Sequence, residues 1–225
     1  MSLALTIVKL GGSHAFSPYL REIAASVAAA RRPAVIVPGG GPFADAVRAA
    51  QAQMGFDDGA AHRMALLAMC QFGEAVASLH PRLRRANGIA RIRAALGANA
   101  VPVWMPWPVC DGLDTLPASW DITSDSLAAW LGAKLGAARL LLLKSADPPA
   151  GQFSAASLVK SGIADPAFPH YLEESGLEAW WLGPATLPHL SSMIDGEGEY
   201  GARILTGTAL TAAPIQKAMR LDEQA

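Results

Sequence analysis

The feature that most constrains the fold is a set of short apolar runs that stop at glycine, proline or lysine. Residues 3–10, 34–37 (AVIV) and 138–144 (ARLLLLK) are such runs, and each has the length and composition of a buried strand. Residues 18–30 have helical spacing, and a glycine turn followed by another helical pattern comes after 34–37. The order strand, helix, strand, glycine loop, helix is typical of a parallel sheet covered by helices.

The rest of the chain continues this alternation. Helical patterns are predicted at 59–79 and 121–136, the second closed by Gly136, and a surface helix with a turn at 80–100. Further strands are predicted at 101–107, 178–182 and 202–206, and a loop-rich stretch at 145–175. Because we find no internal repeat and no clear linker, we expect one domain over 1–225, a three-layer α/β/α sandwich with a mainly parallel central sheet.

Composition excludes several classes of protein. The 225-residue chain has a net charge of -1, and its lysines and arginines form no long stripe, so we expect no nucleic-acid partner. No apolar run approaches the roughly 18 residues of a membrane span, and the N-terminus lacks the pattern of a signal peptide. Two cysteines make no disulfide framework, and no zinc-ligand spacing occurs, so we expect a cytoplasmic protein without a metal site of its own.

The helical segment 59–79 is apolar nearly all round. Such a helix is normally buried on every side. In a chain of this size, we expect it to pack partly against another subunit, which predicts a homo-oligomer, a dimer or larger.

Two glycine-rich segments follow predicted strands: KLGGS (Lys9–Ser13) and PGGGPFAD (38–45). Glycine lets backbone N–H groups approach an anion closely, and a helix N-terminus favours negative charge. A tight turn beside a solvated lysine is the simpler alternative for the first segment. The second also fits the G-x-G-x-x-A pattern of a dinucleotide site, but no strand leads into Asp57 and Asp58, where that site needs an acidic residue. No Walker A loop occurs.

Four charged or titratable residues complete the set of candidates. Asp125 opens the helix at 121–136, where a carboxylate also simply favours the helix, and Lys144 ends a strand, where a solvated lysine is the simpler alternative. Ligands of parallel sheets bind at the carboxyl ends of strands, and Lys9, the triple glycine and Lys144 all follow or end strands. His62 is expected to be a core or capping histidine, whereas the guanidinium of Arg63 could clamp a phosphate.

Taken in order, these motifs resemble the amino acid kinase superfamily, which includes acetylglutamate, uridylate, carbamate, isopentenyl phosphate and aspartate kinases. The similarity lies in K-x-G-G-S, the G-G-G before a helix, the ITSDSLAA…GA.RLLLL block and a late LTGT (Leu205–Thr208), and it covers almost the whole chain. VPGGGPFADAVR, AAHRMALLAMCQFG and GIADPAFP (162–169) look most like one branch, the [5-(aminomethyl)furan-3-yl]methyl phosphate kinases of methanofuran and methylofuran biosynthesis.

The resemblance implies a role for each matching residue. Lys9 would stabilise the transferring phosphoryl group, and Asp125 would orient the catalytic lysines. The glycine amides would hold two sets of phosphates: those of Gly11 and Gly12 on the nucleotide, and those of Gly39, Gly40 and Gly41 on the acceptor. Independently of the resemblance, we place Ser13 with the nucleotide set and Arg63 with the acceptor set.

Two departures from the family pattern concern the second lysine. The usual T-D-x-D-G is KSADP here, so Lys144 and Ser145 replace Thr and Asp while Asp147 keeps the second acid of the nucleotide side. The G-G-M-x-x-K segment that carries a second catalytic lysine in acetylglutamate kinases is SSMID (191–195), without lysine. Lys144 is the candidate substitute, in catalysis and in nucleotide binding.

The resemblance thus implies a kinase that uses ATP and Mg²⁺ to phosphorylate a small molecule already bearing a phosphate. The best guess is [5-(aminomethyl)furan-3-yl]methyl phosphate, converted to its diphosphate. Uridylate and isopentenyl phosphate kinases remain alternatives, as does a non-catalytic nucleotide-binding protein like the molybdenum storage relatives, because fold does not fix function.

Overall fold

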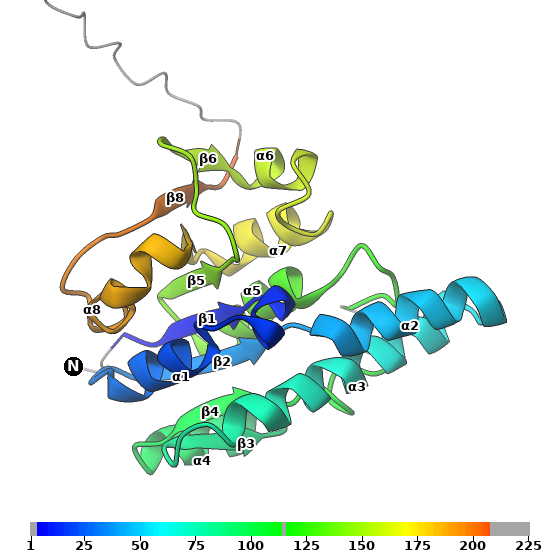
Figure 1. Ribbon diagram of the computed structural model, residues 1–225, viewed down its shortest axis with the longest axis horizontal. Coiled ribbons are helices and arrows are strands. Elements are labelled where there is room, and N and C mark those ends of the chain that lie inside the picture. The colour runs from blue at the N-terminus through cyan, green and yellow to red at the C-terminus, as the bar shows by residue number, and fades with distance from the viewer. Residues whose placement is uncertain (1–3, 114–115, 208–225) are drawn as a thin grey trace, which may run out of the picture.

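The computed structural model describes residues 4–113 and 116–207. They contain an eight-stranded sheet of order β3-β4-β2-β1-β5-β7-β8-β6 (Figure 1), in which only the β7–β8 pair is antiparallel. The strands are β1 Thr6–Leu10, β2 Ala34–Pro38, β3 Leu83–Ala86, β4 Val101–Trp104, β5 Arg139–Leu143, β6 Phe153–Ser154, β7 Glu178–Leu182 and β8 Ala202–Leu205.

Helices cover both faces of the sheet, which confirms the predicted three-layer α/β/α sandwich. The α-helices are α1 Leu20–Ala29, α2 Gly41–Met54, α3 Asp58–Ala77, α4 Ile89–Gly97, α5 Ser124–Leu135, α6 Ala155–Lys160, α7 Phe168–Ser175 and α8 Leu190–Asp195. Two 3₁₀ helices, η1 Gly12–Phe16 and η2 Pro184–His189, follow β1 and β7.

Side-chain alternation along β1 divides the core in two. Ile7 belongs to the cluster that includes α4, α5 and α7, whereas Val8 and Leu10 belong to the cluster that includes α1, α8 and the C-terminal half of α3. All five residues of β1 are buried, as expected for a central strand of a parallel sheet.

Two stretches differ from the sequence prediction. Residues 80–100 contain the expected helix, α4, but also the unpredicted edge strand β3, whose two arginines are exposed. The stretch 145–175, predicted as loop, carries β6, α6 and α7. The predicted strand at 202–206 is β8, while Thr208 of the LTGT motif lies outside the described residues.

Helix α3 is not buried all round. It packs against α2, β2, β3 and β4 and leaves one face to solvent, where Met64 and Leu67 are 37% and 40% exposed. Within 4–113 and 116–207, no helix has both the length and the apolar character that crossing a membrane requires.

Candidate functional site

The candidate residues that follow or end strands lie together at the carboxyl ends of three neighbouring strands, and we call this edge of the sheet the rim. β1 lies between β2 and β5 and is parallel to both, with Leu10 level with Pro38 and Leu143. Lys9 is the penultimate residue of β1, Lys144 directly follows β5, and the triple glycine directly follows β2. The parallel topology therefore brings together residues that are more than a hundred positions apart in the sequence.

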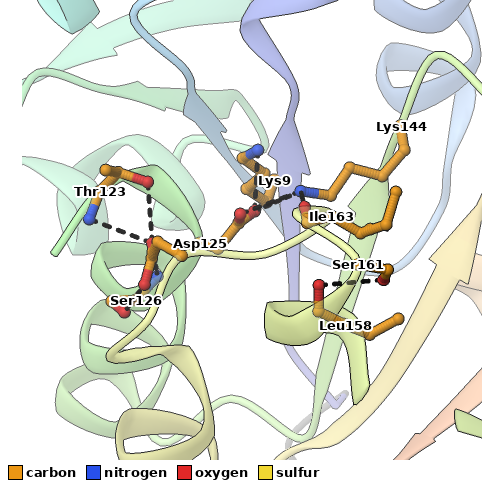
Figure 2. Close-up of polar contacts among 9 residues, drawn as sticks. Lys9, Thr123, Asp125, Ser126, Lys144, Leu158, Ser161 and Ile163 are labelled. Carbon is orange, nitrogen blue, oxygen red and sulfur yellow. Dashed lines mark hydrogen bonds and ion pairs between the residues drawn. The ribbon is translucent and has the colours of Figure 1, made fainter. Parts of the chain in front are cut away.

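Two lysines share one carboxylate at this rim (Figure 2). The Nζ of Lys9 lies 2.8 Å from Oδ1 of Asp125, and the Nζ of Lys144 lies 3.0 Å from Oδ1 and 2.9 Å from Oδ2 of the same residue. Asp125 sits in the first turn of α5, where the helix N-terminus adds to the positive potential. The cluster carries two positive charges and one negative charge, so it has a net positive charge.

Burial makes these charges strongly dependent on one another. The side chains of Lys9, Asp125 and Lys144 are only 5%, 6% and 14% exposed. Burial disfavours the carboxylate of Asp125, but the two lysines outweigh that effect and lower its pKa to about 2. For Lys144, burial and the nearby Lys9 outweigh the attraction of Asp125 and lower its pKa to about 8.

The segment before α7 closes over this cluster. The carbonyl of Ile163 accepts a further hydrogen bond from Nζ of Lys144. Two residues on, the buried carboxylate of Asp165 accepts hydrogen bonds from the amide and hydroxyl of both Thr123 and Ser126, at the start of α5. Asp165 therefore fixes the helix end that carries Asp125. Burial, and secondarily the charge of Asp125, raise the pKa of Asp165.

The two glycine loops touch each other through their main chains. A Cβ on Gly12 would lie 2.3 Å from the amide nitrogen of Gly41, and a Cβ on Gly39 would lie 2.5 Å from the amide nitrogen of Gly12. No side chain fits at such distances, so the contact itself requires glycine.

Only some of the glycine amides are free to bind an anion. Gly11 donates to the carbonyl of Leu143, and Gly39 donates to that of Leu10, so these two amides belong to the sheet. The amides at the start of a helix have no partner within it. At the rim these are the amides of Gly12 and Ser13 in η1, and of Gly40 and Gly41 at the start of α2.

A pocket of about 420 Å³ opens beside these amides. Gly12, Ser13, Gly40 and Gly41 line one side, and Ser124, next to Asp125, lines another. The remaining wall comes from α2, α3 and the segment before α5, and its polar or aromatic members are Asp45, Arg48, His62, Ser119, Trp120 and Thr123.

A stacked pair forms part of this wall. The guanidinium of Arg48 lies 4.3 Å from the ring centroid of Trp120, and it also contacts the carboxylate of Asp45 at 3.2 Å. Trp120 Nε1 donates to Oε1 of Gln51 at 2.8 Å, which fixes the ring. The pocket thus offers a cation, a carboxylate and an aromatic surface next to the glycine amides.

Two of the predicted binding residues lie elsewhere. Arg63 is exposed and lines a neighbouring hollow with Gly59 and Asp111. That hollow shares His62 with this pocket, but Arg63 is not among the pocket's residues. Arg48, on α2, is the arginine that lines this pocket. Asp147 accepts a hydrogen bond from the amide of Ala185 at 2.9 Å, beyond the ends of β5 and β7.

Three residues of the site escaped the sequence analysis: Arg48, Trp120 and Asp165. Arg48 follows Gly41 and Ala44 on one face of α2, so helical spacing from the glycine loop could have identified it. Trp120 and Asp165 lie in irregular segments, where no periodic signal exists. Across 4–113 and 116–207, no group of three histidine, cysteine or acidic side chains is arranged to hold a metal ion.

Comparisons with known proteins agree with this geometry. Residues 4–83, which include Lys9 and both glycine loops, match the sequence profile of the Amino acid kinase family. The [5-(aminomethyl)furan-3-yl]methyl phosphate kinase of Methanocaldococcus jannaschii is 22% identical over 210 residues, which cover 88% of this chain and 97% of that protein.

Solved structures share the fold. Uridylate kinase from Archaeoglobus fulgidus superimposes with a TM-score of 0.67 at 18% identity, over 89% of this chain and 99% of that one. An isopentenyl phosphate kinase gives a TM-score of 0.61 at 20% identity, over 89% of this chain and 100% of that one. The chain is thus similar to the Amino acid kinase family over residues 4–83, and it shares the fold of these solved structures.

Proposed function

We propose that the protein is an ATP-dependent phosphotransferase that transfers the γ-phosphoryl group to a small molecule already bearing a phosphate. The observation that carries the proposal is the buried cluster of Lys9, Asp125 and Lys144 beside two loops with free amides. The best acceptor is [5-(aminomethyl)furan-3-yl]methyl phosphate, because the Methanocaldococcus jannaschii relative named for it matches nearly the whole chain.

Charge repulsion is the main obstacle to such a reaction. Phosphoryl transfer requires in-line positioning and neutralisation of charge, and little covalent work by the protein. A phosphate monoester has its second pKa near about 6, so at neutral pH it is already an ionised nucleophile and needs no general base. The absence of a base from the proposed catalytic set (Lys9, Asp125, Lys144) therefore fits a phosphate acceptor better than an alcohol.

Each part of the rim has a task in this scheme. Lys9 and Lys144 would stabilise the negative charge of the transferring group, while Asp125 holds both ammonium groups in place. The amides of Gly40 and Gly41, with Arg48, would bind the acceptor phosphate from the pocket. Since Lys144 bonds both oxygens of Asp125, it can supply the second lysine that the SSMID segment lacks.

The same rim fits a nucleotide. The amides of Gly12 and Ser13 have no helical partner, and we propose that they hold the β- and γ-phosphates of ATP. Lys144 and Asp147, after β5, would lie on the nucleotide side. When bound, Mg²⁺ supplies charge neutralisation on the phosphate oxygens, which commonly provide most of its ligands.

The test is an acceptor panel. Purified protein is incubated with ATP, Mg²⁺ and, separately, the aminomethylfuran phosphate, uridylate or isopentenyl phosphate, and the diphosphate product is identified by mass spectrometry. We expect the furan diphosphate. Faster formation of uridine or isopentenyl diphosphate would reassign the acceptor, and ATP binding without turnover of any acceptor would indicate a binding protein and refute the proposal.

We also propose that residues 1–225 form a single kinase-like domain that assembles as a homo-oligomer. The exposed apolar side chains of Met64 and Leu67 on α3 support the second point.

A further inference from the structure

One polar atom in the acceptor pocket lacks a partner. His62 lines the pocket, yet the residue is only 6% exposed. Its Nε2 atom is buried and has no hydrogen-bond partner among the described residues. An unsatisfied buried nitrogen costs about 1–3 kcal/mol, so the arrangement calls for a partner that is present only when the pocket is filled.

The surroundings of His62 determine what this nitrogen can do. Burial lowers the pKa of the His62 ring, and the nearby Arg63 lowers it further. The charge of Asp111 and a hydrogen bond to the Ser119 backbone raise this pKa, but by less than burial lowers it. The imidazole is therefore neutral at neutral pH. A neutral imidazole has one donor nitrogen and one acceptor nitrogen.

The contact with the Ser119 backbone indicates which of the two ring nitrogens of His62 carries the proton. A backbone contact that favours the protonated ring is one in which the ring donates to the carbonyl. Because Nε2 is the unpartnered atom, Nδ1 carries the proton towards Ser119 and Nε2 presents a lone pair. The pocket thus contains a buried hydrogen-bond acceptor as well as the phosphate-binding amides of Gly40 and Gly41.

We propose that Nε2 of His62 accepts a hydrogen bond from an N–H group of the phosphorylated acceptor, so that this histidine selects amine-bearing phosphomonoesters. The inference rests on the proposed function and deepens it: the phosphate end binds the glycine amides, and the primary ammonium of an aminomethyl group meets the histidine. An acceptor without a donor leaves Nε2 unpaired, and sites of this type discriminate strongly against such ligands.

The test compares two ligands on the full-length protein. Binding of [5-(aminomethyl)furan-3-yl]methyl phosphate and of its analogue with methyl in place of aminomethyl is measured by calorimetry, without ATP. We expect the wild-type protein to bind the amine at least about tenfold more tightly, and His62→Leu to remove most of that preference. His62→Gln, which keeps an acceptor oxygen, should retain part of it, and the same leucine substitution at exposed His170, outside the pocket, should leave it unchanged.

The outcomes separate the inference from the proposed function. Equal wild-type affinity for the two ligands overturns the role of His62 even if His62→Leu fails to fold, and so does an unchanged preference in a folded His62→Leu. Binding of neither ligand also overturns it. Selective binding with no phosphoryl transfer from ATP would instead confirm the role of His62 and refute the proposed kinase activity.

Discussion

The charge of Lys144 makes the site sensitive to pH just above neutrality. Its pKa is lowered from 10.5 to about 8, by burial and by Lys9, against the opposing attraction of Asp125. The charged groups that face the ammonium of Lys144 are Lys9, from β1, and Asp125, from α5. The buried ring of His14 lies near the main chain of Lys144. If the ammonium stabilises the transferring phosphoryl group, activity must fall as it loses its proton.

The expected effects on activity and on stability have opposite signs. Above pH about 8 the charged fraction of Lys144, and with it kcat, should fall about tenfold per pH unit. The unfolded chain binds more protons than the folded one between pH about 8 and 10.5, so the contribution of this group to the free energy of unfolding rises across that window. A pKa change from 10.5 to about 8 corresponds to about 3 kcal/mol.

The assay measures ADP release at saturating substrates and urea unfolding, both from about pH 6.5 to about pH 10. In Lys144→Arg the guanidinium stays charged throughout, so both pH effects should disappear even if the absolute rate changes. Lys160→Arg, on the exposed end of α6, is the matched control and should behave as wild type. A wild-type rate that stays level to pH about 10, or an alkaline fall that persists in Lys144→Arg, would refute the reasoning.

Three further predictions concern other parts of the molecule. Lys9→Ala should lower kcat by about 10²–10³-fold with an unchanged circular dichroism spectrum, because Asp125 keeps Lys144 as its partner; near-normal turnover would contradict the role of Lys9. Asp165→Ala should lower the free energy of unfolding in urea by about 2–4 kcal/mol, because it leaves the buried donors at the start of α5 unpaired, and an unchanged midpoint would be inconsistent with that. Leu67→Glu should convert an oligomer to a monomer in light scattering, and a monomeric wild type would show the oligomer prediction to be wrong.

The sequence predicts the centre of the fold well because physical signals are strong there. β1, β2, β5 and β7 are short, mostly apolar runs, and Gly136 ends α5 in the left-handed conformation that glycine favours. Edge strand β3 was missed because its four residues do not alternate: two adjacent exposed arginines lie between two buried residues. The helices α6 and α7, of 6 and 8 residues, are too short for periodicity to register.

For the site, the sequence identified residues at strand ends but not those that reach it from elsewhere. Lys9, Asp125 and Lys144 were found because topology alone brings strand ends and helix starts together. The sequence analysis named Arg63 and not Arg48, although Arg48 lines this pocket and Arg63 does not, because the difference depends on the rotation of two helices about their axes. Asp165 acts across forty residues of sequence, through contacts that only the folded chain reveals.

The direct main-chain contact between Gly12 and Gly41 has a consequence for the kinetics. On the proposed assignment, Gly12 serves the nucleotide and Gly41 serves the acceptor phosphate, so the two loops would bind their ligands while in direct contact with each other. When one substrate immobilises its own loop, the neighbouring loop loses freedom before its ligand arrives, so the second binding step costs less conformational entropy. Substrate synergy, with each ligand tightening the apparent affinity for the other by the same factor, is therefore expected from this contact between the two loops.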